Sequence, residues 1–144
     1  MPDPITLMPD WIRGQVVRVA DGDTIRVQAH LGLGIEARAE PCRLLGIQAP
    51  ELQGDDKLLG QEARRVLSSL VLERTVYIHA PGEQRDRYGR WLIWLWLPER
   101  DRLRSINTEM VHTGHAWQWW PKGWGHRGSL PPRVVARPGP LTAE

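Results

Sequence analysis

The sequence predicts a mainly β fold of the α+β class, in which five strands close into a small barrel and two helices pack on its outside. Short segments of β-branched and apolar residues alternate with turns rich in glycine, proline and aspartate, as is typical of strands. One such segment, residues 90–97, is apolar on both faces, which suits a barrel strand covered by helices. Helical periodicity is confined to two segments.

Length and composition favour one soluble domain. The chain has 144 residues, of which 41% are hydrophobic, enough for a substantial core. No apolar run approaches the length that spans a bilayer, so we expect no membrane partner. The N-terminus has neither a basic start nor an apolar core, which argues against a signal peptide and favours a cytoplasmic over a secreted protein. The single cysteine, Cys42, excludes an internal disulfide.

The first half of the chain predicts an arm, three strands and a helix. Residues 1–12 contain three prolines and are expected to form an irregular N-terminal arm. Residues 14–30 predict a hairpin, because β-branched residues flank an aspartate–glycine turn. Residues 35–47 predict a third strand, in which neighbouring side chains point to opposite faces. A loop is expected over residues 52–60, and a helix over residues 60–73, where apolar residues recur at helical spacing.

The second half predicts two further strands, a short helix and a tail. Residues 75–80 and 90–97 are the strands, and residues 105–113 are the helix, with Gly114 expected as its C-cap. Residues 121–144 are rich in proline and glycine without a period, which predicts an irregular tail that tolerates deletion beyond about residue 128. Residues 13–120 are therefore the expected domain. Its elements fit a Greek-key barrel of the oligonucleotide/oligosaccharide-binding (OB) type.

Arginine dominates the basic residues. Seventeen of the 19 lysines and arginines are arginine, which grips phosphate with two parallel hydrogen bonds where lysine is a point charge. An ordinary solvated surface explains most of these arginines equally well. Arg43 and Arg90 are different, because they stand inside motifs that also carry carboxylates.

Three motifs bring phosphate-binding and acidic groups into this small domain. They are the turn DGDT at residues 21–24, RLLGIQAPE at residues 43–51 and DRYGR at residues 86–90. Two guanidinium groups beside acidic oxygens suit the hydrolysis of a phosphodiester around a metal ion. The turn alone would be weak evidence, because a plain turn aspartate is common in such a setting.

With GQEA at residues 60–63 and a further pattern over residues 107–116, the motifs resemble the thermonuclease family of staphylococcal-nuclease-like domains. The resemblance covers residues 13–118 and implies the same OB-type barrel. It also implies a third helix after the Ala116 region, for which this chain shows no pattern, because Pro121 and Gly123 would break it. A barrel face left uncovered there would offer a route to oligomerisation.

The resemblance implies a calcium site. Asp23 and Gln48 match the side-chain ligands, and Ala49 matches a position whose backbone carbonyl also binds the ion. Family members usually carry aspartate at the position of Gln48. Because calcium affinity depends on the number of charged ligands, Gln48 predicts weak calcium binding, a different divalent ion or none. Asp21 matches an acidic position near the metal.

The resemblance also implies the reaction. Glu51 matches the general base that deprotonates water, Arg43 and Arg90 match the arginines that stabilise the transition state, and Arg87 and Tyr88 match contacts to a terminal phosphate. The expected activity is hydrolysis of DNA, and of RNA as a second substrate, leaving 3′-phosphate ends. The tryptophans Trp117, Trp119, Trp120 and Trp124 suggest a platform on which bases stack, and Trp119 or Trp120 matches the aromatic residue that relatives place on the base. Eight tryptophans and no phenylalanine indicate, however, that tryptophan mainly fills the core.

Two other functions remain as alternatives. One is a binding module for nucleic acid or protein, derived from a nuclease and without catalysis. Such modules typically lose the arginine pair and the glutamate that this chain retains. The other is a structural oligomer held together by the tail, and it rests only on the missing helix.

Overall fold

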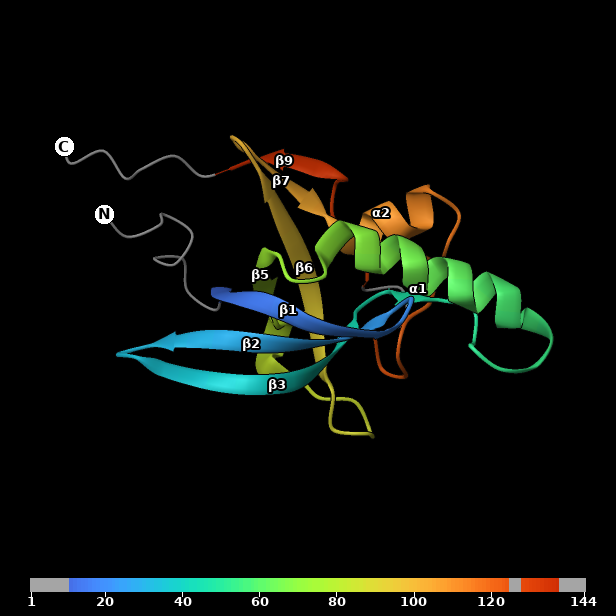
Figure 1. Cartoon of the computed structure of the whole chain (residues 1–144), viewed down its shortest axis with the longest axis horizontal. Helices are drawn as coiled ribbons and strands as arrows, with labels where there is room; N and C mark the ends of the chain where they lie inside the picture. Colours follow the sequence, from blue (N-terminus) through green and yellow to red (C-terminus); the bar gives the residue numbers. More distant parts are fainter. Residues whose placement is uncertain (1–10, 125–127, 138–144) are drawn as a thin grey trace.

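Five strands of the computed structural model close into a barrel, as predicted. The structure describes residues 11–124 and 128–137. Neighbouring strands pair in the order β3-β2-β1-β5-β6 (Figure 1). A parallel pairing of Cys42–Leu44 with Trp91–Ile93 joins β3 to β6 and closes the barrel. The barrel strands are β1 (Trp11–Asp21), β2 (Thr24–Gly32), β3 (Ile35–Leu44), β5 (Thr75–His79) and β6 (Trp91–Glu99).

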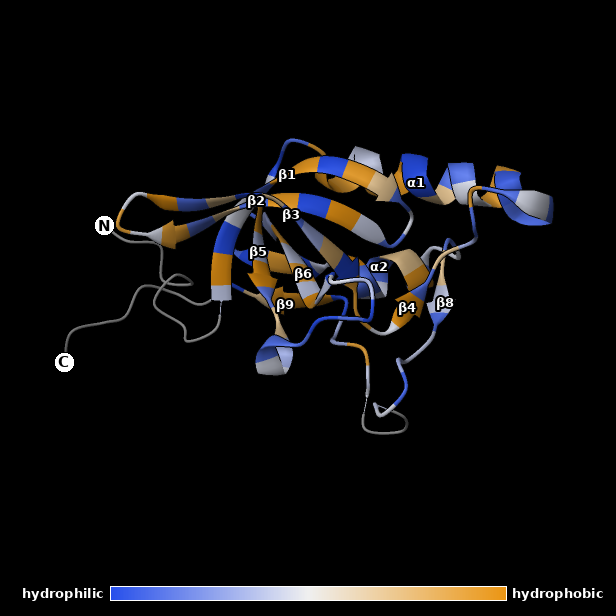
Figure 2. Ribbon diagram, turned by 90° about the horizontal axis from the view of Figure 1, so that it is seen from below, coloured by the Kyte–Doolittle hydropathy of each residue, from blue (hydrophilic) through white to orange (hydrophobic). Residues whose placement is uncertain are grey.

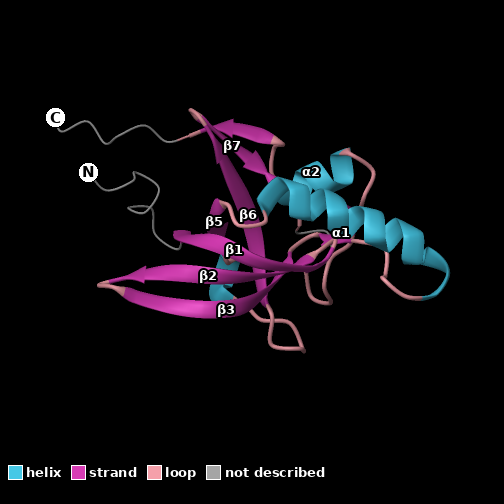
Figure 3. Ribbon diagram, viewed as in Figure 1, coloured by secondary structure: helices cyan, strands magenta, loops and turns pink. Residues whose placement is uncertain are grey.

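Two helices lie outside the barrel, toward the end away from the tip of the β2–β3 hairpin (Figures 1 and 3). Helix α1 (Lys57–Val71) turns Ala63, Leu67 and Val71 into the core. Helix α2 (Ile106–His112) begins at Ser105, whose hydroxyl caps the backbone N–H of Thr108. The helices thus cover the part of the barrel that carries the DGDT and RLLGIQAPE motifs.

The core has the apolar pattern that the strands predict (Figure 2). Ile93, Leu95 and Leu97 of β6 enter the main core cluster, whereas Trp96 on the other face packs with Tyr77 and Leu103 in a second cluster. The two-sided burial of β6 is therefore confirmed. Cys42 is buried in the core, and burial raises the pKa of its thiol to about 12.

The element boundaries differ from the expectation at several places. β3 ends at Leu44, three residues before the expected end of the third strand, and β6 continues to Glu99. Helix α1 begins at Lys57 and ends at Val71, because a short 3-10 helix, η2 (Gly54–Asp56), leads directly into it. The loop expected over residues 52–60 is correspondingly shorter. Gly114 lies one residue beyond the C-cap Thr113 and has a φ of 80°. There it lets the backbone N–H groups of residues 115 and 116 return to the carbonyl of Met110.

Four short strands were not expected from the sequence. β7 (Arg102–Ser105) extends the sheet from the edge of β6, at the opposite end from its pairing with β3. β4 (Ile47–Gln48) and β8 (Trp117–Gln118) pair with each other. β9 (Val134–Ala136) pairs with β7. Segments of two to four residues show too little alternation to be recognised.

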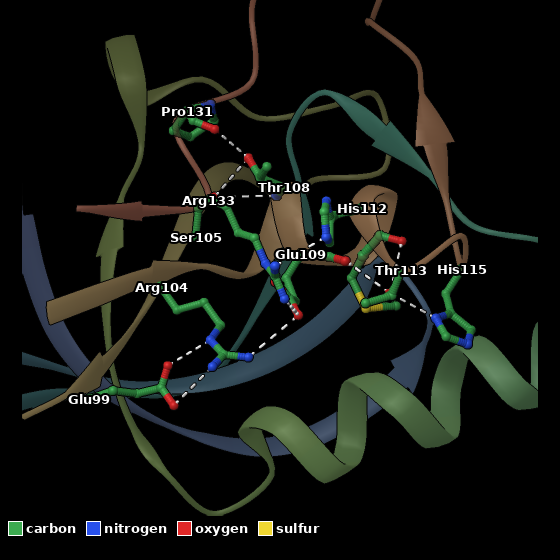
Figure 4. A network of polar contacts seen from close by, with 11 residues as sticks. Glu99, Arg104, Ser105, Thr108, Glu109, His112, Thr113, His115, Pro131 and Arg133 are labelled. Atoms are coloured by element: carbon green, nitrogen blue, oxygen red, sulfur yellow. Dashed lines mark hydrogen bonds and ion pairs between the residues drawn. The ribbon is translucent and has the colours of Figure 1, made fainter.

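The prediction of an irregular tail is wrong for residues 134–136, which form β9, whereas tolerance of the tail to deletion stays a prediction. β9 completes the edge of β7, the backbone N–H of Ser105 donates to the carbonyl of Arg133 at 2.9 Å, and the hydroxyl of Thr108 donates to the carbonyl of Pro131 at 2.6 Å. Figure 4 shows Arg133 and Arg104 converging on Glu109 of α2. The tail thus pairs with the edge strand β7 and supplies a cation to the buried carboxylate of Glu109. No helix occurs in residues 121–124 or 128–137, as predicted.

The expected N-terminal arm falls mostly outside the described residues, which begin at residue 11; residues 11 and 12 belong to β1. Residues 125–127 and 138–144 of the tail also fall outside them. Within the described part of the chain, no helix is long and apolar enough to cross a bilayer.

Candidate active site

One cavity of about 740 Å³ gathers nearly all the side chains that the motifs single out. It is bounded by the DGDT turn, the start of the loop after β4, the turn before β6 and the segment after β8. Ala49 does not line it, because that residue is buried beneath. The predicted site residues that line the cavity are Asp23, Arg43, Gln48, Glu51, Arg87, Tyr88 and Arg90.

The DGDT turn is held in place by close packing at Gly22. A Cβ atom at Gly22 would lie 2.6 Å from the Cβ of Ala63 in α1 and 2.7 Å from the Cβ of Ala49. Only glycine fits this space without a shift of its neighbours. Asp21 tightens the turn, because its carboxylate accepts the backbone N–H of Asp23 at 3.0 Å. Helix α1 thereby sets the depth of Asp23 in the cavity.

Asp23 is almost fully buried, and each of its carboxylate oxygens has a donor. Its Oδ2 accepts the backbone N–H of Ala49 at 2.8 Å and lies 3.2 Å from the guanidinium of Arg43. Its Oδ1 accepts the hydroxyl of Thr24 at 2.9 Å. Burial, helped by the neighbouring Asp21, raises the pKa of Asp23 to about 6, and Arg43 and Ala49 oppose that rise. A cation in the cavity would favour the ionised form.

Arg43 links Asp23 to Gln48. Besides its ion pair with Asp23, its Nη2 donates to the Oε1 of Gln48 at 2.7 Å. The amide of Gln48 in turn donates to the carbonyl of Ala49 at 3.1 Å. The ring of Trp119 lies 5.6 Å from the Arg43 guanidinium carbon, as in a cation–π contact. Arg43 is only 7% exposed, so its position is strongly determined.

Arg90 is oriented by two further residues of the motifs. Its Nε donates to the Oδ2 of Asp86 at 2.6 Å, and its Nη1 donates to the Thr24 hydroxyl at 3.2 Å. Burial works against the charge of Asp86, but hydrogen bonds from Arg90 and from the Tyr88 backbone lower the pKa of that carboxyl. A continuous polar network therefore runs from Asp86 through Arg90, Thr24, Asp23 and Arg43 to Gln48.

Glu51 reaches the cavity from the loop that leads to η2, and its side chain is exposed to solvent. Gly60 of α1 lets this loop lie against the helix. A Cβ atom at Gly60 would come within 2.2 Å of the Glu51 carbonyl oxygen. The GQEA segment therefore has a structural role in the site, since its glycine fixes the path of the glutamate-bearing loop.

Arg87 and Tyr88 lie at the exposed rim of the cavity. Tyr88 is 67% exposed, and its ring lies 4.9 Å from the Arg87 guanidinium carbon and 5.2 Å from that of Arg90. An aromatic face flanked by two guanidinium groups can hold a negatively charged or stacked ligand. The structure thus places these residues beside Arg90, where the motif predicts them.

The sequence alone assigned no role to five of the residues that build the site. Thr24 and Asp86 belong to the motifs and were detectable as neighbours of Asp23 and Arg90, but no role was predicted for them. Gln84 and Arg85 precede the DRYGR motif, and Arg85 stacks on Trp91 at 4.0 Å. Lys122 comes from the tail, where no pattern identified it, whereas Trp124 belongs to the tryptophans that suggested base stacking.

The oxygen donors around Asp23 suit a hard cation only in part. Calcium takes carboxylate, amide and carbonyl oxygens, which Asp21, Asp23 and Gln48 present at the cavity. Gln48 contributes no charge, and its oxygen already accepts a hydrogen bond from Arg43. Among the described residues, no three or more histidines, cysteines, aspartates and glutamates are grouped to hold a metal ion.

The comparison of the chain with protein families agrees with this site. The sequence profile described as "Staphylococcal nuclease homologue" matches residues 41–128, which is more than half of the chain. The chain belongs to the staphylococcal nuclease family. The matched region contains six of the seven predicted site residues that line the cavity, namely Arg43, Gln48, Glu51, Arg87, Tyr88 and Arg90. Asp23 lies before it, on the strand hairpin that the structure joins to the same cavity.

Several relatives within the staphylococcal nuclease family carry nuclease names. The chain is 39% identical over 106 residues to an uncharacterized endonuclease of Escherichia coli O157:H7, covering 74% of this chain and 60% of that protein. It is 34% identical over 120 residues to a micrococcal nuclease of Shigella flexneri, covering 78% and 63% respectively. Protein ParB of Escherichia coli matches with 34% identity over 120 residues, covering 78% and 62%. The chain therefore spans about three-fifths of the length of these curated relatives.

Proposed function

We propose that this staphylococcal nuclease family domain hydrolyses phosphodiester bonds of DNA, with RNA as a second substrate. The observation that carries the proposal is the convergence of Glu51, Arg43 and Arg90 on one cavity from three separate segments. The nuclease names of its relatives support the same reaction class. A phosphodiester at this site meets two oriented guanidinium groups and one accessible carboxylate.

The proposed reaction is attack by water on phosphorus. Glu51 takes a proton from the water as its oxygen forms the new bond to phosphorus. The bond from phosphorus to the 5′ oxygen breaks, and that oxygen takes a proton from solvent to become a 5′-hydroxyl group, while Glu51 returns the proton of the attacking water to solvent. The phosphate stays on the 3′ oxygen of the other product. Arg43 and Arg90 stabilise the negative charge that develops on the phosphoryl oxygens.

The surroundings of the two arginines support this role. Asp23 and Gln48 hold Arg43, and Asp86 and Thr24 hold Arg90, so neither guanidinium has to reorganise when charge develops. Arg87 and Tyr88, at the rim, bind a neighbouring phosphate of the substrate in this proposal. The chain's own side chains thus supply both the base and the charge stabilisation.

A divalent cation is part of the proposal as a weakly held cofactor. Asp23 would hold it, with the amide oxygen of Gln48, and it would supply Lewis-acid polarisation of a phosphoryl oxygen. The carbonyl of Ala49 would join them only by giving up its hydrogen bond from the Gln48 amide. Calcium is the ion we propose, bound weakly because Gln48 is neutral, or replaced by another divalent ion.

A binding module without catalysis is the second candidate, and one observation favours it. The oxygens of Asp23 and Gln48 are already satisfied by Arg43, Ala49 and Thr24, so the network is complete without a cation. In that case the cavity would bind a strand and leave it intact.

Product analysis separates the two candidates. Single-stranded DNA labelled at its 5′ end is incubated with the protein in calcium and, in parallel, in a chelator. The nuclease proposal predicts fragments whose 3′ ends become extendable by a polymerase only after phosphatase treatment. Strands that are bound but stay intact under both conditions would support the binding module.

A further inference from the structure

The C-terminal segment contributes residues to the cavity that the reaction described above does not use. Pro121, Lys122 and Trp124 all line it. Lys122 is exposed and Trp124 is half-buried. A cation and an aromatic ring at the same cavity are the two groups that bind a nucleotide, one through its phosphate and the other through its base.

A tight turn brings these two side chains together. The backbone N–H of Trp124 donates to the carbonyl of Pro121 at 3.0 Å, which closes a four-residue turn. Gly123 is the third residue of this turn and has a φ of 95°, a conformation that glycine adopts without strain. The PKGW sequence that breaks the expected helix therefore builds part of the cavity wall.

The chain is anchored just before this turn. The backbone N–H of Trp119 donates to the carbonyl of Gly46 at 3.0 Å. The ring of Trp120 packs edge-on against Trp94, with centroids 6.1 Å apart. Cβ atoms at Gly46 and Gly128 would lie 2.7 Å and 2.4 Å from that ring, so it is enclosed between two glycines. Trp120 thus serves as an anchor, whereas Trp119 and Trp124 line the cavity.

The chain is anchored again after the turn. Pro131 accepts the hydroxyl of Thr108, Arg133 pairs with Glu109 and β9 pairs with β7. Anchors on both sides hold the turn at the cavity wall, so little ordering is needed when a ligand binds. Preorganisation of this kind favours affinity.

Lys122 has no carboxylate within ion-pair distance among the described residues, whereas Arg43 and Arg90 are each paired with one. A cavity of about 740 Å³ also exceeds what the scissile phosphate and one nucleoside require. The unpaired cation, the second aromatic ring and the spare volume all point to a further nucleotide of the substrate strand.

We propose that Lys122 and Trp124 form a second nucleotide subsite, which binds a phosphate and an unpaired base of a single strand adjacent to the scissile phosphodiester. The proposal rests on the proposed nuclease function for the location of the scissile bond, but it concerns binding alone. It names single-stranded nucleic acid as the substrate class, because the bases of a duplex are not free to stack on Trp124.

Equilibrium binding of an uncleavable strand tests the subsite separately from the reaction. The probe is fluorescein-labelled hexathymidylate with phosphorothioate linkages, followed by fluorescence anisotropy at several salt concentrations. Thymidine 3′,5′-bisphosphate serves as the one-nucleotide ligand, and the matched duplex as the double-stranded one. The variants are Trp124→Ala and Lys122→Gln, with Trp117→Ala and Lys57→Gln as controls, because Trp117 and Lys57 are exposed and do not line the cavity.

We expect Trp124→Ala to weaken hexathymidylate binding about 5- to 150-fold. Lys122→Gln should reduce the slope of log affinity against log salt by ~0.7, the contribution of one phosphate in a single strand. Neither variant should change bisphosphate binding, and the controls should match the wild type.

Several results would overturn the subsite. It would be overturned if the variants lost no more affinity than the controls, or if they lost as much affinity for the bisphosphate as for the strand. A duplex that binds as tightly and is equally sensitive to Trp124→Ala would also overturn it. So would a wild-type protein that does not bind the strand. A strand that binds as expected, together with intact natural DNA in the cleavage assay, would support the subsite and reject the nuclease.

Discussion

Arg90 is oriented by Asp86, four residues before it, and by Thr24 from another strand. Replacing it by alanine removes a preorganised donor of positive charge while leaving the barrel core untouched. We expect Arg90→Ala to lower the cleavage rate by ~10²–10³. Single-turnover cleavage of DNA measures the change. Arg65→Ala is the control, since Arg65 is an exposed arginine on α1 that pairs, among the described residues, with Glu62 alone. A loss of only a few-fold for Arg90→Ala would show that it binds substrate without stabilising the transition state.

Gln48 determines the charge of the proposed cation site. Gln48→Asp keeps an oxygen near Arg43 and adds the negative charge that a hard dication lacks there. We expect calcium affinity in the free protein to rise by at least about tenfold, as measured by calorimetry. Gln118→Asp is the matched control, because Gln118 lies on the strand that pairs with β4 but does not line the cavity. Equal affinities for the wild type and Gln48→Asp would mean that the ion is held elsewhere.

Single residues in contiguous motifs were predictable, and those outside them were not. Asp23, Arg43, Glu51 and Arg90 each belong to a recognisable pattern, and the structure places them at one cavity. Trp124 belongs to the group of tryptophans but to none of the motifs, and its position depends on how Trp120 packs between two glycines. That packing couples Trp120 to Gly46, 74 positions before it, and no local rule reveals it.

At the scale of elements, the segment from residue 128 to residue 137 binds β7 and α2. Its Arg133 pairs with Glu109, which is only 4% exposed, and Arg104 approaches the same carboxylate. Hydrogen bonding from Arg133, with the charges of Arg133 and Arg104, holds the pKa of Glu109 below its ordinary value of 4.5. The ionised carboxylate is therefore part of what holds the tail in place.

This depressed pKa predicts a specific acid sensitivity. At pH values just below about 4.5, Glu109 stays ionised in the folded chain, whereas it has begun to bind a proton in the unfolded chain. The stabilisation of the fold by ionised Glu109 is therefore present above about pH 4.5 and is lost as pH falls toward the lowered pKa. Glu109→Gln should lower the free energy of unfolding by about 1–3 kcal/mol at pH 7. Its difference from the wild type should shrink as pH falls below 4.5. Urea unfolding at several pH values measures this, with Glu73→Gln as control, because Glu73 is exposed and makes no ion pair among the described residues. A difference independent of pH would contradict the account.

Truncation tests the same element without a change of charge at α2. A chain ending at residue 127 loses β9, Arg133 and the carbonyl of Pro131. It leaves Glu109 buried without its main partner, which should cost at least about 3 kcal/mol of stability. Thermal unfolding compares it with a chain ending at residue 137, which keeps every contact described here. Equal stability of the two chains would support the sequence-based expectation of a dispensable tail.

Long elements were predicted well, and the shortest were missed. The barrel strands and both helices have the periodicity of their class over five residues or more, so only their ends were misplaced. β9 has three residues after two prolines, and it forms because the edge of β7 is available. Pairing to a distant edge decides such strands, and the local sequence carries little of that information.

At the scale of the molecule, the closed barrel turns scattered motifs into one site. β1, β2 and β3 carry Asp23 and Arg43, and the parallel contact of β3 with β6 brings the turn that holds Arg90 beside them. Oligomerisation through a bare barrel face stays a prediction, and residues 128–137 of the tail contact β7 and α2. The central claim of the account is that this assembled site cleaves nucleic acid with Glu51 as its base.

The most direct test is to compare cleavage and binding of single-stranded DNA by the wild type and Glu51→Gln. Glu51 is exposed and makes no ion pair among the described residues, so the substitution should leave the fold intact. The account predicts that the cleavage rate falls by ~10²–10⁴ while affinity for the strand stays unchanged. Equal cleavage by the two proteins, or none by the wild type despite tight binding, would contradict it.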